Sequence, residues 1–176
     1  AGYTFAGWNT QSNGSGDNYL SGSLFTVQSS NVTLYAKWSA NSYTITYNSN
    51  GGTGSAQRSS SNVSTDTYTT GGSSVALPGA GTLERAGYTF DGWNTSAAGT
   101  GTNRAAGDTY TTVSDVIFYA KWNPVTYSIT YAGNTSDGGT TPTTGGYTTG
   151  QASPYSVVAN TFTKTLHVFG GWNTAA

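Results

Sequence analysis

The sequence predicts an all-β or mainly β protein with little or no helix, built as a tandem of small twisted sheet modules that are antiparallel or mixed. The first observation is compositional: the 176 residues include 25 Gly and 13 Tyr but one Glu and no Met, so strand and turn formers outnumber good helix formers. The second is a strict alternation of apolar and polar residues over short stretches. The third is an internal repeat.

The repeat is carried by three copies of one phrase and two copies of another. "GYTFAGWNT" places Trp8, "GYTFDGWNT" places Trp93 and "VFGGWNT" places Trp172, with steps of 85 (93 − 8) and 79 (172 − 93) residues. "LYAKW" and "FYAKW" end at Trp38 and Trp122, a step of 84 (122 − 38). The unit is therefore about eighty residues long.

The strands of one unit follow in order from alternation and turn signals. "YTITY" (residues 43–47) is the first strand, and "NSNGGTGS" after it is a turn and loop. "SSVALPG" (73–79) is a short strand stopped by proline and glycine. "GYTFDGW" (87–93) is a strand whose glycine allows a bulge or close packing. "DTYTTV" (108–113) is a short strand or turn, and "VIFYAKW" (116–122) closes the unit.

Short polar joints separate the units. "SANS" stands between Trp38 and Tyr43, and "NPVT" between Trp122 and Tyr127, so both are expected to be linkers. Residues 1–40 are then the C-terminal half of a repeat unit, residues 41–123 a complete unit, and residues 124–176 the N-terminal half of another. We expect the two halves to complement one another, either within the chain or head-to-tail between chains, because exposed sheet edges pair.

The repeated aromatic phrases have two interpretations. They fill the core of each module, or they form exposed stacking platforms for sugars. We favour the core, because a buried ring contributes about 5 kcal/mol and a small module needs few of them. The predicted structural core comprises Trp8, Trp38, Tyr43, Ile45, Tyr47, Phe90, Trp93, Phe118, Trp122, Tyr127, Ile129, Tyr131 and Trp172.

"YTITYNSNGGTGS", "GYTFDGWNT", "FYAKW" and the stretch from residue 7 to residue 38 resemble the Listeria–Bacteroides repeat, also called the B-repeat of internalin-type surface proteins. The resemblance covers nearly the whole chain. It implies a β-grasp-like fold, a place on a long secreted or wall-attached bacterial protein, and no catalytic residues. One stretch departs from the pattern: residues 56–85 are longer than in the compact repeat, as a specificity loop or a plain surface excursion.

Other polar residues are weighed between a site and a structural role. The asparagines after each tryptophan are expected to cap turns. Lys37 and Lys121 fit exposed strand positions better than a covalent cross-link, for which the one glutamate, Glu84, would serve a single unit. His167 fits a solvent-facing strand residue better than a catalytic base. Three loop carboxylates offer one ligand each and so predict turns rather than calcium sites: Asp17, Asp108 and Asp115.

Composition excludes several function classes. A net charge of −1 with 7% charged residues provides no basic face for nucleic acid, and the absence of Cys excludes thiolate metal sites. No apolar run reaches the length of a membrane span. We therefore expect no cofactor, no metal and no enzymatic activity. The expected function is an extracellular or cell-surface stalk or adhesin segment whose partners are neighbouring repeats, copies of itself, or a host or cell-surface protein or glycan. The alternative is a carbohydrate-binding module.

Overall fold

A computed structural model of the chain describes residues 2–151 and 155–175, and within these ranges it contains strands and no helix. The strands are β1 (Tyr3–Asn9), β2 (Asn18–Tyr19), β3 (Tyr35–Ala40), β4 (Ser42–Asn48), β5 (Ala56–Arg58), β6 (Ser61–Val63), β7 (Thr65–Thr69), β8 (Val75–Ala76), β9 (Tyr88–Asn94), β10 (Asn103–Arg104), β11 (Thr109–Tyr110), β12 (Val116–Pro124), β13 (Thr126–Ile129), β14 (Gly138–Gly139), β15 (Gly145–Thr148) and β16 (Phe162–Thr163). The prediction of a mainly β chain is confirmed.

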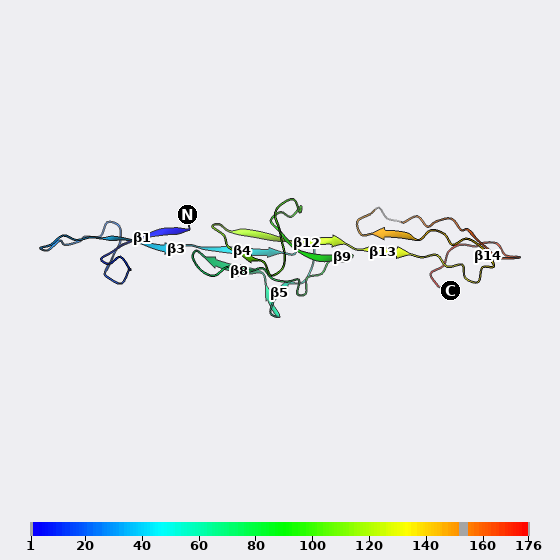
Figure 1. The fold of residues 1–176 in the computed structure, drawn as a ribbon, viewed down its shortest axis with the longest axis horizontal. Helices are drawn as coiled ribbons and strands as arrows, with labels where there is room; N and C mark the ends of the chain where they lie inside the picture. Colours follow the sequence, from blue (N-terminus) through cyan, green and yellow to red (C-terminus); the bar gives the residue numbers. More distant parts are fainter. Residues whose placement is uncertain (1, 152–154, 176) are drawn as a thin grey trace. The chain divides into compact units, whose positions relative to one another are not determined.

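The largest sheet is mixed and has the strand order β10-β9-β12-β4-β7. Its centre is a parallel pair, in which Phe118 of β12 stands opposite Tyr47 of β4. Figure 1 shows β12 beside β4, although 67 residues lie between the two strands in the sequence (48 to 116). A sheet whose first and last strands are parallel neighbours needs a long crossover connection, which residues 49–115 provide here.

The edge strand β7 comes from the stretch that departs from the compact repeat. Residues 56–85 hold the β5–β6 hairpin, the five-residue strand β7 and the short strand β8. β7 pairs antiparallel with β4 from Ser42↔Thr69 to Thr46↔Thr65. This stretch is therefore partly sheet and not only a loop. Its Ser/Thr composition concealed the strand, because polar alternation with one aromatic residue gives a weak apolar period.

The first segment, residues 2–40, repeats part of that sheet as β2-β1-β3. Trp8 stands opposite Tyr19 on one side and Ala36 on the other. The register shifts between Phe5 and Gly7 in β1, at the glycine that corresponds to the one for which sequence analysis allowed a bulge in residues 87–93. A Cβ on Gly7, whose φ is +115°, would lie 2.4 Å from the carbonyl oxygen of Tyr19, which only glycine tolerates.

The last segment repeats the other part of the sheet. β13 pairs antiparallel with β15, from Thr126↔Thr148 to Ile129↔Gly145, as β4 pairs with β7. A second two-stranded ladder joins β14 to β16. The sequence repeat is thus present in the described part of the chain as three segments whose strands are paired to different extents.

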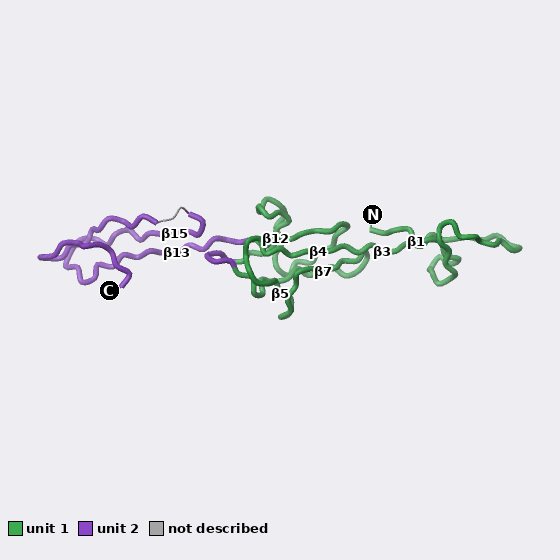
Figure 2. Tube along the Cα trace, turned by 180° about the vertical axis from the view of Figure 1, so that it is seen from behind, with its two compact units in different colours: residues 1–84, 90–121 green, residues 85–89, 122–176 purple. Residues whose placement is uncertain are grey.

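Two compact units divide the chain, as Figure 2 shows: residues 1–84 with 90–121, and residues 85–89 with 122–176. Inside each unit one expected linker proves to be strand. Only Asn41 separates β3 from β4, and only Val125 separates β12 from β13. The "SANS" and "NPVT" stretches are therefore nearly continuous strands, because their backbone groups find hydrogen-bond partners on neighbouring strands.

Candidate functional site

The Trp93 phrase lies at the centre of the complete repeat. Trp93 is fully buried, with Tyr47 tilted over it at 5.1 Å and Phe90 edge-on at 5.3 Å between ring centroids. Its indole Nε1–H donates to the carbonyl oxygen of Pro78 at 2.8 Å. Burial of a ring this size contributes about 5 kcal/mol before opposing terms, and the bonded N–H avoids the cost of an unsatisfied polar group.

The thirteen predicted core residues are divided by the structure into three groups. Five are buried: Ile45, Tyr47, Trp93, Phe118 and Tyr131. Five are half-buried: Tyr43, Phe90, Trp122, Ile129 and Trp172. Three are exposed, which differs from the prediction: Trp8, Trp38 and Tyr127. Sequence reasoning also left out Leu77 and Pro78, which are buried and lie in the stretch that departs from the compact repeat.

Trp8 and Trp38 are exposed because the first segment has no counterpart of the strand that covers Trp93. In the complete repeat Tyr47 of β4 lies against the indole, whereas among residues 2–40 only Phe5 packs on both tryptophans. Phe5 stands edge-on at 5.2 Å from Trp8 and 5.7 Å from Trp38. The exposed fractions are 39% for Trp8 and 58% for Trp38.

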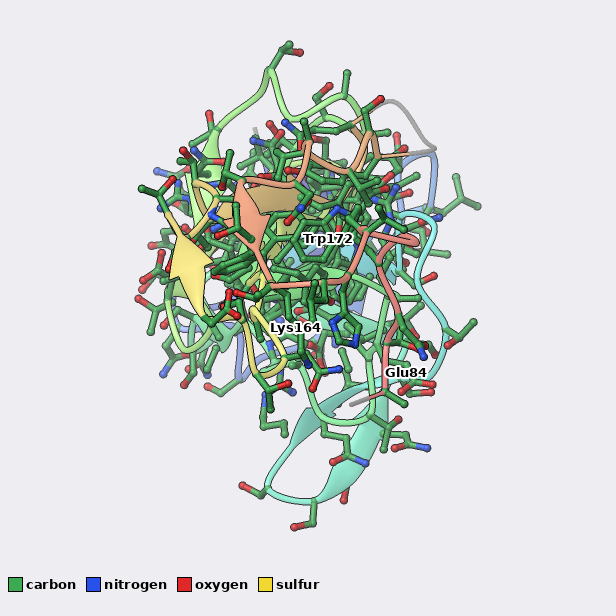
Figure 3. The ribbon with its side chains drawn as sticks, turned by 90° about the vertical axis from the view of Figure 1, so that its right-hand side faces the viewer. Glu84, Lys164 and Trp172 are labelled. Atoms are coloured by element: carbon green, nitrogen blue, oxygen red, sulfur yellow. The ribbon has the colours of Figure 1, made fainter. Side chains whose placement is uncertain are left out.

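Trp172 in the last segment (Figure 3) keeps most of the Trp93 environment. Its Nε1–H donates to the carbonyl oxygen of Val158 at 2.9 Å, as Trp93 donates to Pro78. Tyr131, the counterpart of Tyr47, lies over it at 4.7 Å between ring centroids. The amide of Val158 in turn donates to the Tyr131 hydroxyl at 3.1 Å. This segment therefore forms a partial core of its own.

The asparagine after the tryptophan organises the next loop. The Asn94 Nδ2 donates to the carbonyl oxygens of Gly99 (3.3 Å) and Gly101 (3.1 Å) and to Asn103 Oδ1 (2.8 Å). Its Oδ1 accepts from the backbone amides of Ser96 (2.7 Å) and Gly101 (3.1 Å). Asn94 is 1% exposed, so this network satisfies a buried amide on both sides.

Asn9 makes the same five bonds in the first segment. Its Nδ2 donates to Gly14, Gly16 and Asn18, and its Oδ1 accepts from Gln11 and Gly16, at 2.7–3.2 Å. For Asn173 the structure shows Oδ1 accepting from the amide of Ala175 at 3.3 Å. Asn9 and Asn94 thus do more than the simple turn cap that sequence reasoning expected, because each one closes the loop that ends nine residues later, at Asn18 and Asn103.

One charged cluster lies beside the aromatic core, and sequence reasoning missed it. Arg58 binds both carboxylate oxygens of Asp66, at 3.0 and 2.7 Å, and the Tyr47 hydroxyl donates to Asp66 Oδ2 at 2.8 Å. Arg58 also donates to the carbonyl oxygen of Ala76. No sequence signal pointed to the cluster, since Arg58 and Asp66 stand eight residues apart in a Ser/Thr-rich stretch and meet only through the β5–β6 hairpin.

Protonation equilibria in the cluster follow from burial and these bonds. Burial acts to raise the pKa of Asp66, but the hydrogen bonds from Arg58 and Tyr47 outweigh it, so the pKa falls below its ordinary value. Burial, and then the bond to Asp66, raises the pKa of the Tyr47 phenol well above its usual range. The bond with Asp66 raises the pKa of Arg58. Asp66 is therefore ionised and Tyr47 neutral at neutral pH, which suits a structural cluster.

The remaining polar candidates have partners of their own. Lys121 forms an ion pair with Asp91 at 2.7 Å, and Lys37 donates to Asn18 Oδ1 at 2.8 Å. Glu84 is exposed (Figure 3), and its backbone pairs with Thr53. The Nδ1 of the exposed His167 lies 2.8 Å from the carbonyl oxygen of Thr165.

The three loop carboxylates take part in turns and strand ends. Asp115 accepts from the amide of Thr44 at 2.8 Å, which ties the start of β12 to β4. Asp108 accepts from the amide of Ala105 at 2.9 Å. The backbone of Asp17 bonds Thr10 in both directions, at 3.0 and 3.1 Å. Among the described residues no three His, Cys, Asp or Glu side chains gather as a metal site would require.

A hollow of about 130 Å³ lies beside Trp93 of β9, lined by residues of β4, β5 and β6 and of the loops next to them. Ligand pockets generally measure ~300–1,000 Å³, so this hollow is small for an organic ligand. None of the residues that line the hollow is charged. In the described part of the chain, no helix is long and apolar enough to cross a membrane.

One family model matches most of the chain. The profile of the Listeria-Bacteroides repeat domain matches residues 1–37 and 43–121. A "Putative Gly-rich membrane protein" of Evansella cellulosilytica is 53% identical over 51 residues, which is 29% of this chain and 6% of the relative. A "Putative membrane protein" of the same organism is 50% identical over 40 residues, or 23% of this chain and 6% of the relative. No solved structure matches.

Proposed function

The chain belongs to the Listeria-Bacteroides repeat domain family, and from this membership we propose that it is a structural and interaction segment of a secreted or cell-surface bacterial protein. Its repeats act as a stalk or adhesin segment. The two relatives are named as membrane proteins, which supports a parent at the cell envelope. The matched stretch is 6% of each relative, as expected for a small repeated part of a long protein.

The burial of the repeated phrase carries this proposal. Trp93 is fully enclosed with its N–H bonded, and Asn94 is 1% exposed with its amide bonded on both sides. A side chain in this state has no surface to offer a ligand. The phrase is therefore repeated because every module needs the same core and the same loop closure, and the proposal assigns it no catalytic role.

Self-association is the second element of the proposal. In the complete repeat, β12 lies parallel to β4 with Phe118 opposite Tyr47. The counterpart of Phe118 is Leu34, next to β3, and the counterpart of Tyr47 is Tyr131, next to β13. β3 pairs only with β1, and β13 only with β15, among the described strands. Pairing between β3 of one copy and β13 of another would repeat the central register, and copies joined this way form a head-to-tail filament.

Light scattering against concentration tests this assembly. We expect the mean mass of the purified chain to rise with concentration. Thr130 lies just outside the β13–β15 ladder. The variant Thr130→Pro should have a lower mean mass than the wild type at the same concentration, because proline removes a backbone donor from the edge that pairs. A wild-type chain that remains monomeric over the whole range would refute the assembly but leave the stalk proposal standing.

A second candidate function is carbohydrate binding, which the exposed aromatic group of the first segment favours. Phe5, Trp8 and Trp38 are 36%, 39% and 58% exposed and stand next to one another. Titration of a glycan panel while Trp fluorescence is followed distinguishes the two functions. A saturable signal that Trp38→Ala abolishes would favour the binding module, and a flat response across the panel is the outcome expected of a stalk.

A further inference from the structure

The two joints between repeats are built from the same backbone bonds. At the first joint the Asn41 amide donates to the carbonyl oxygen of Gly2 at 2.9 Å, and the Thr70 amide donates to the carbonyl oxygen of Asn41 at 2.9 Å. At the second joint the Val125 amide donates to Gly87 at 2.8 Å, and the Thr149 amide donates to Val125 at 3.0 Å. One residue between two strands is thus bonded on both of its edges.

The two joints also have the same close contacts between glycines and side chains. A Cβ on Gly2 would lie 2.8 Å from Thr70 Cγ2, and a Cβ on Gly87 would lie 2.5 Å from Thr149 Oγ1. Both glycines have a left-handed φ, +95° and +79°. The Tyr3 hydroxyl lies 2.8 Å from the ideal Cβ position of Gly71, and the Tyr88 hydroxyl lies 3.4 Å from that of Gly150. Each joint therefore places a Gly-Tyr dipeptide against a Thr-Gly dipeptide.

We propose that these two dipeptides are the halves of a docking interface and that its partner is the neighbouring repeat of the same family. The Gly-Tyr end of one repeat holds the Thr-Gly end of the next, and the bridging residue bonds to both of them through its backbone. The first half must be glycine, because any side chain there meets the threonine of the next repeat. This inference rests on one part of the proposed function, the tandem arrangement of the repeats. It does not depend on the proposed cell-surface location of the protein.

The third phrase lacks the first half of the interface. Leu166 and His167 stand six and five residues before Trp172, where Gly87 and Tyr88 stand before Trp93. Leu166 has a φ of +59° and a side chain, and it is 98% exposed. The interface therefore selects its neighbours: a repeat carrying Gly-Tyr docks onto Thr-Gly, and a repeat carrying Leu-His does not.

Hydrogen exchange on the full chain tests the interface. Gly87→Ala should speed exchange of the Val125 and Thr149 amides by about tenfold or more relative to the wild type, because overpacking adds to the strain of a left-handed alanine. Gly107→Ala is the matched control: its φ is +87° and nothing lies within 4 Å of its Cβ. The Tyr47 amide, bonded to Ser64, reports on the complete repeat and should keep its protection in both variants.

Two further results decide the proposal. Gly87→Ala combined with Thr149→Ala should recover part of the lost protection, since the alanine at 149 removes the two nearest atoms, Oγ1 and Cγ2. Gly2→Ala should speed exchange at Asn41 and Thr70 in the same way. The proposal is overturned if Gly87→Ala leaves Val125 and Thr149 at wild-type rates, or if Gly107→Ala accelerates them equally. Either failure leaves the stalk proposal untouched, because that depends on the module core and on surface location.

Discussion

The first segment and the complete repeat contain the same nine-residue phrase apart from one position, and the structure treats its parts differently. The loops closed by Asn9 and Asn94 agree bond for bond. The tryptophans do not agree, since Trp8 is 39% exposed and Trp93 is fully buried. The loop needs only residues within nine positions, whereas the core needs β4 and Pro78. Residues close to the asparagine in the sequence are therefore sufficient to form the loop. The core around the tryptophan also requires residues that are farther away in the sequence.

The largest expected effect concerns the difference in burial between Trp93 and Trp8. Trp93→Ala should destabilise the complete repeat by ~3–5 kcal/mol, because it leaves a cavity under Tyr47 and Phe90 and an acceptor on Pro78 without its donor. Trp8→Ala should cost ~1–2 kcal/mol, since its indole is already partly in water. Chemical denaturation of each variant measures both values. Equal losses at the two positions would contradict the contrast.

The second prediction tests whether Asn9 and Asn94 stabilise their loops to the same extent. Asn94→Ala should cost ~2–3 kcal/mol, because it leaves two carbonyl oxygens and two amides of the loop without partners. Asn9→Ala should weaken its own loop to the same extent, as amide exchange at Gly16 and Gly101 would report. Asn173→Ala is the control and should change stability by less than ~0.5 kcal/mol, because within residues 155–175 its side chain is exposed and accepts one hydrogen bond, from the amide of Ala175. A loop at Asn9 that tolerated alanine better than the loop at Asn94 would show that burial of the tryptophan supports the loop.

The smallest expected effect concerns a feature that the first segment lacks. Asp66→Asn should cost ~1–2 kcal/mol at neutral pH, since it removes the ion pair with the partly exposed Arg58. The folded-state pKa of Asp66 is lowered, so its contribution is complete above the ordinary value of 3.8 and disappears as the pH falls through the folded-state value. The stability difference between wild type and variant should therefore shrink only below about pH 4. Urea titrations at several pH values measure it, and a difference that is constant down to pH 2 would refute this assignment.

The strands that sequence reasoning placed correctly have a clear apolar period. The alternation in "YTITY" and "VIFYAKW" predicted β4 and β12. The glycine of "GYTFDGW" allowed a bulge or close packing, and the structure shows a bulge at the matching Gly7 of β1. The edge strand β7 was missed because its one large apolar side chain, Tyr68, gives no period. The joints were missed for a related reason. "SANS" and "NPVT" are polar and look like linkers, but a strand with both edges bonded does not need apolar side chains to form.

The sequence by itself determined the family, the mainly β class, the eighty-residue unit and the residue types that recur in it. Those features are encoded locally, in periods, turns and repeated phrases. The tertiary structure decided which repeated rings are buried, how Arg58 meets Asp66 beside Tyr47, and which backbone groups bond Asn41 and Val125. Each of these depends on residues far apart in the chain, and a phrase of nine residues does not specify whether its covering strand is present. Two nearly identical phrases therefore form a closed core around Trp93 and an exposed aromatic group at Trp8.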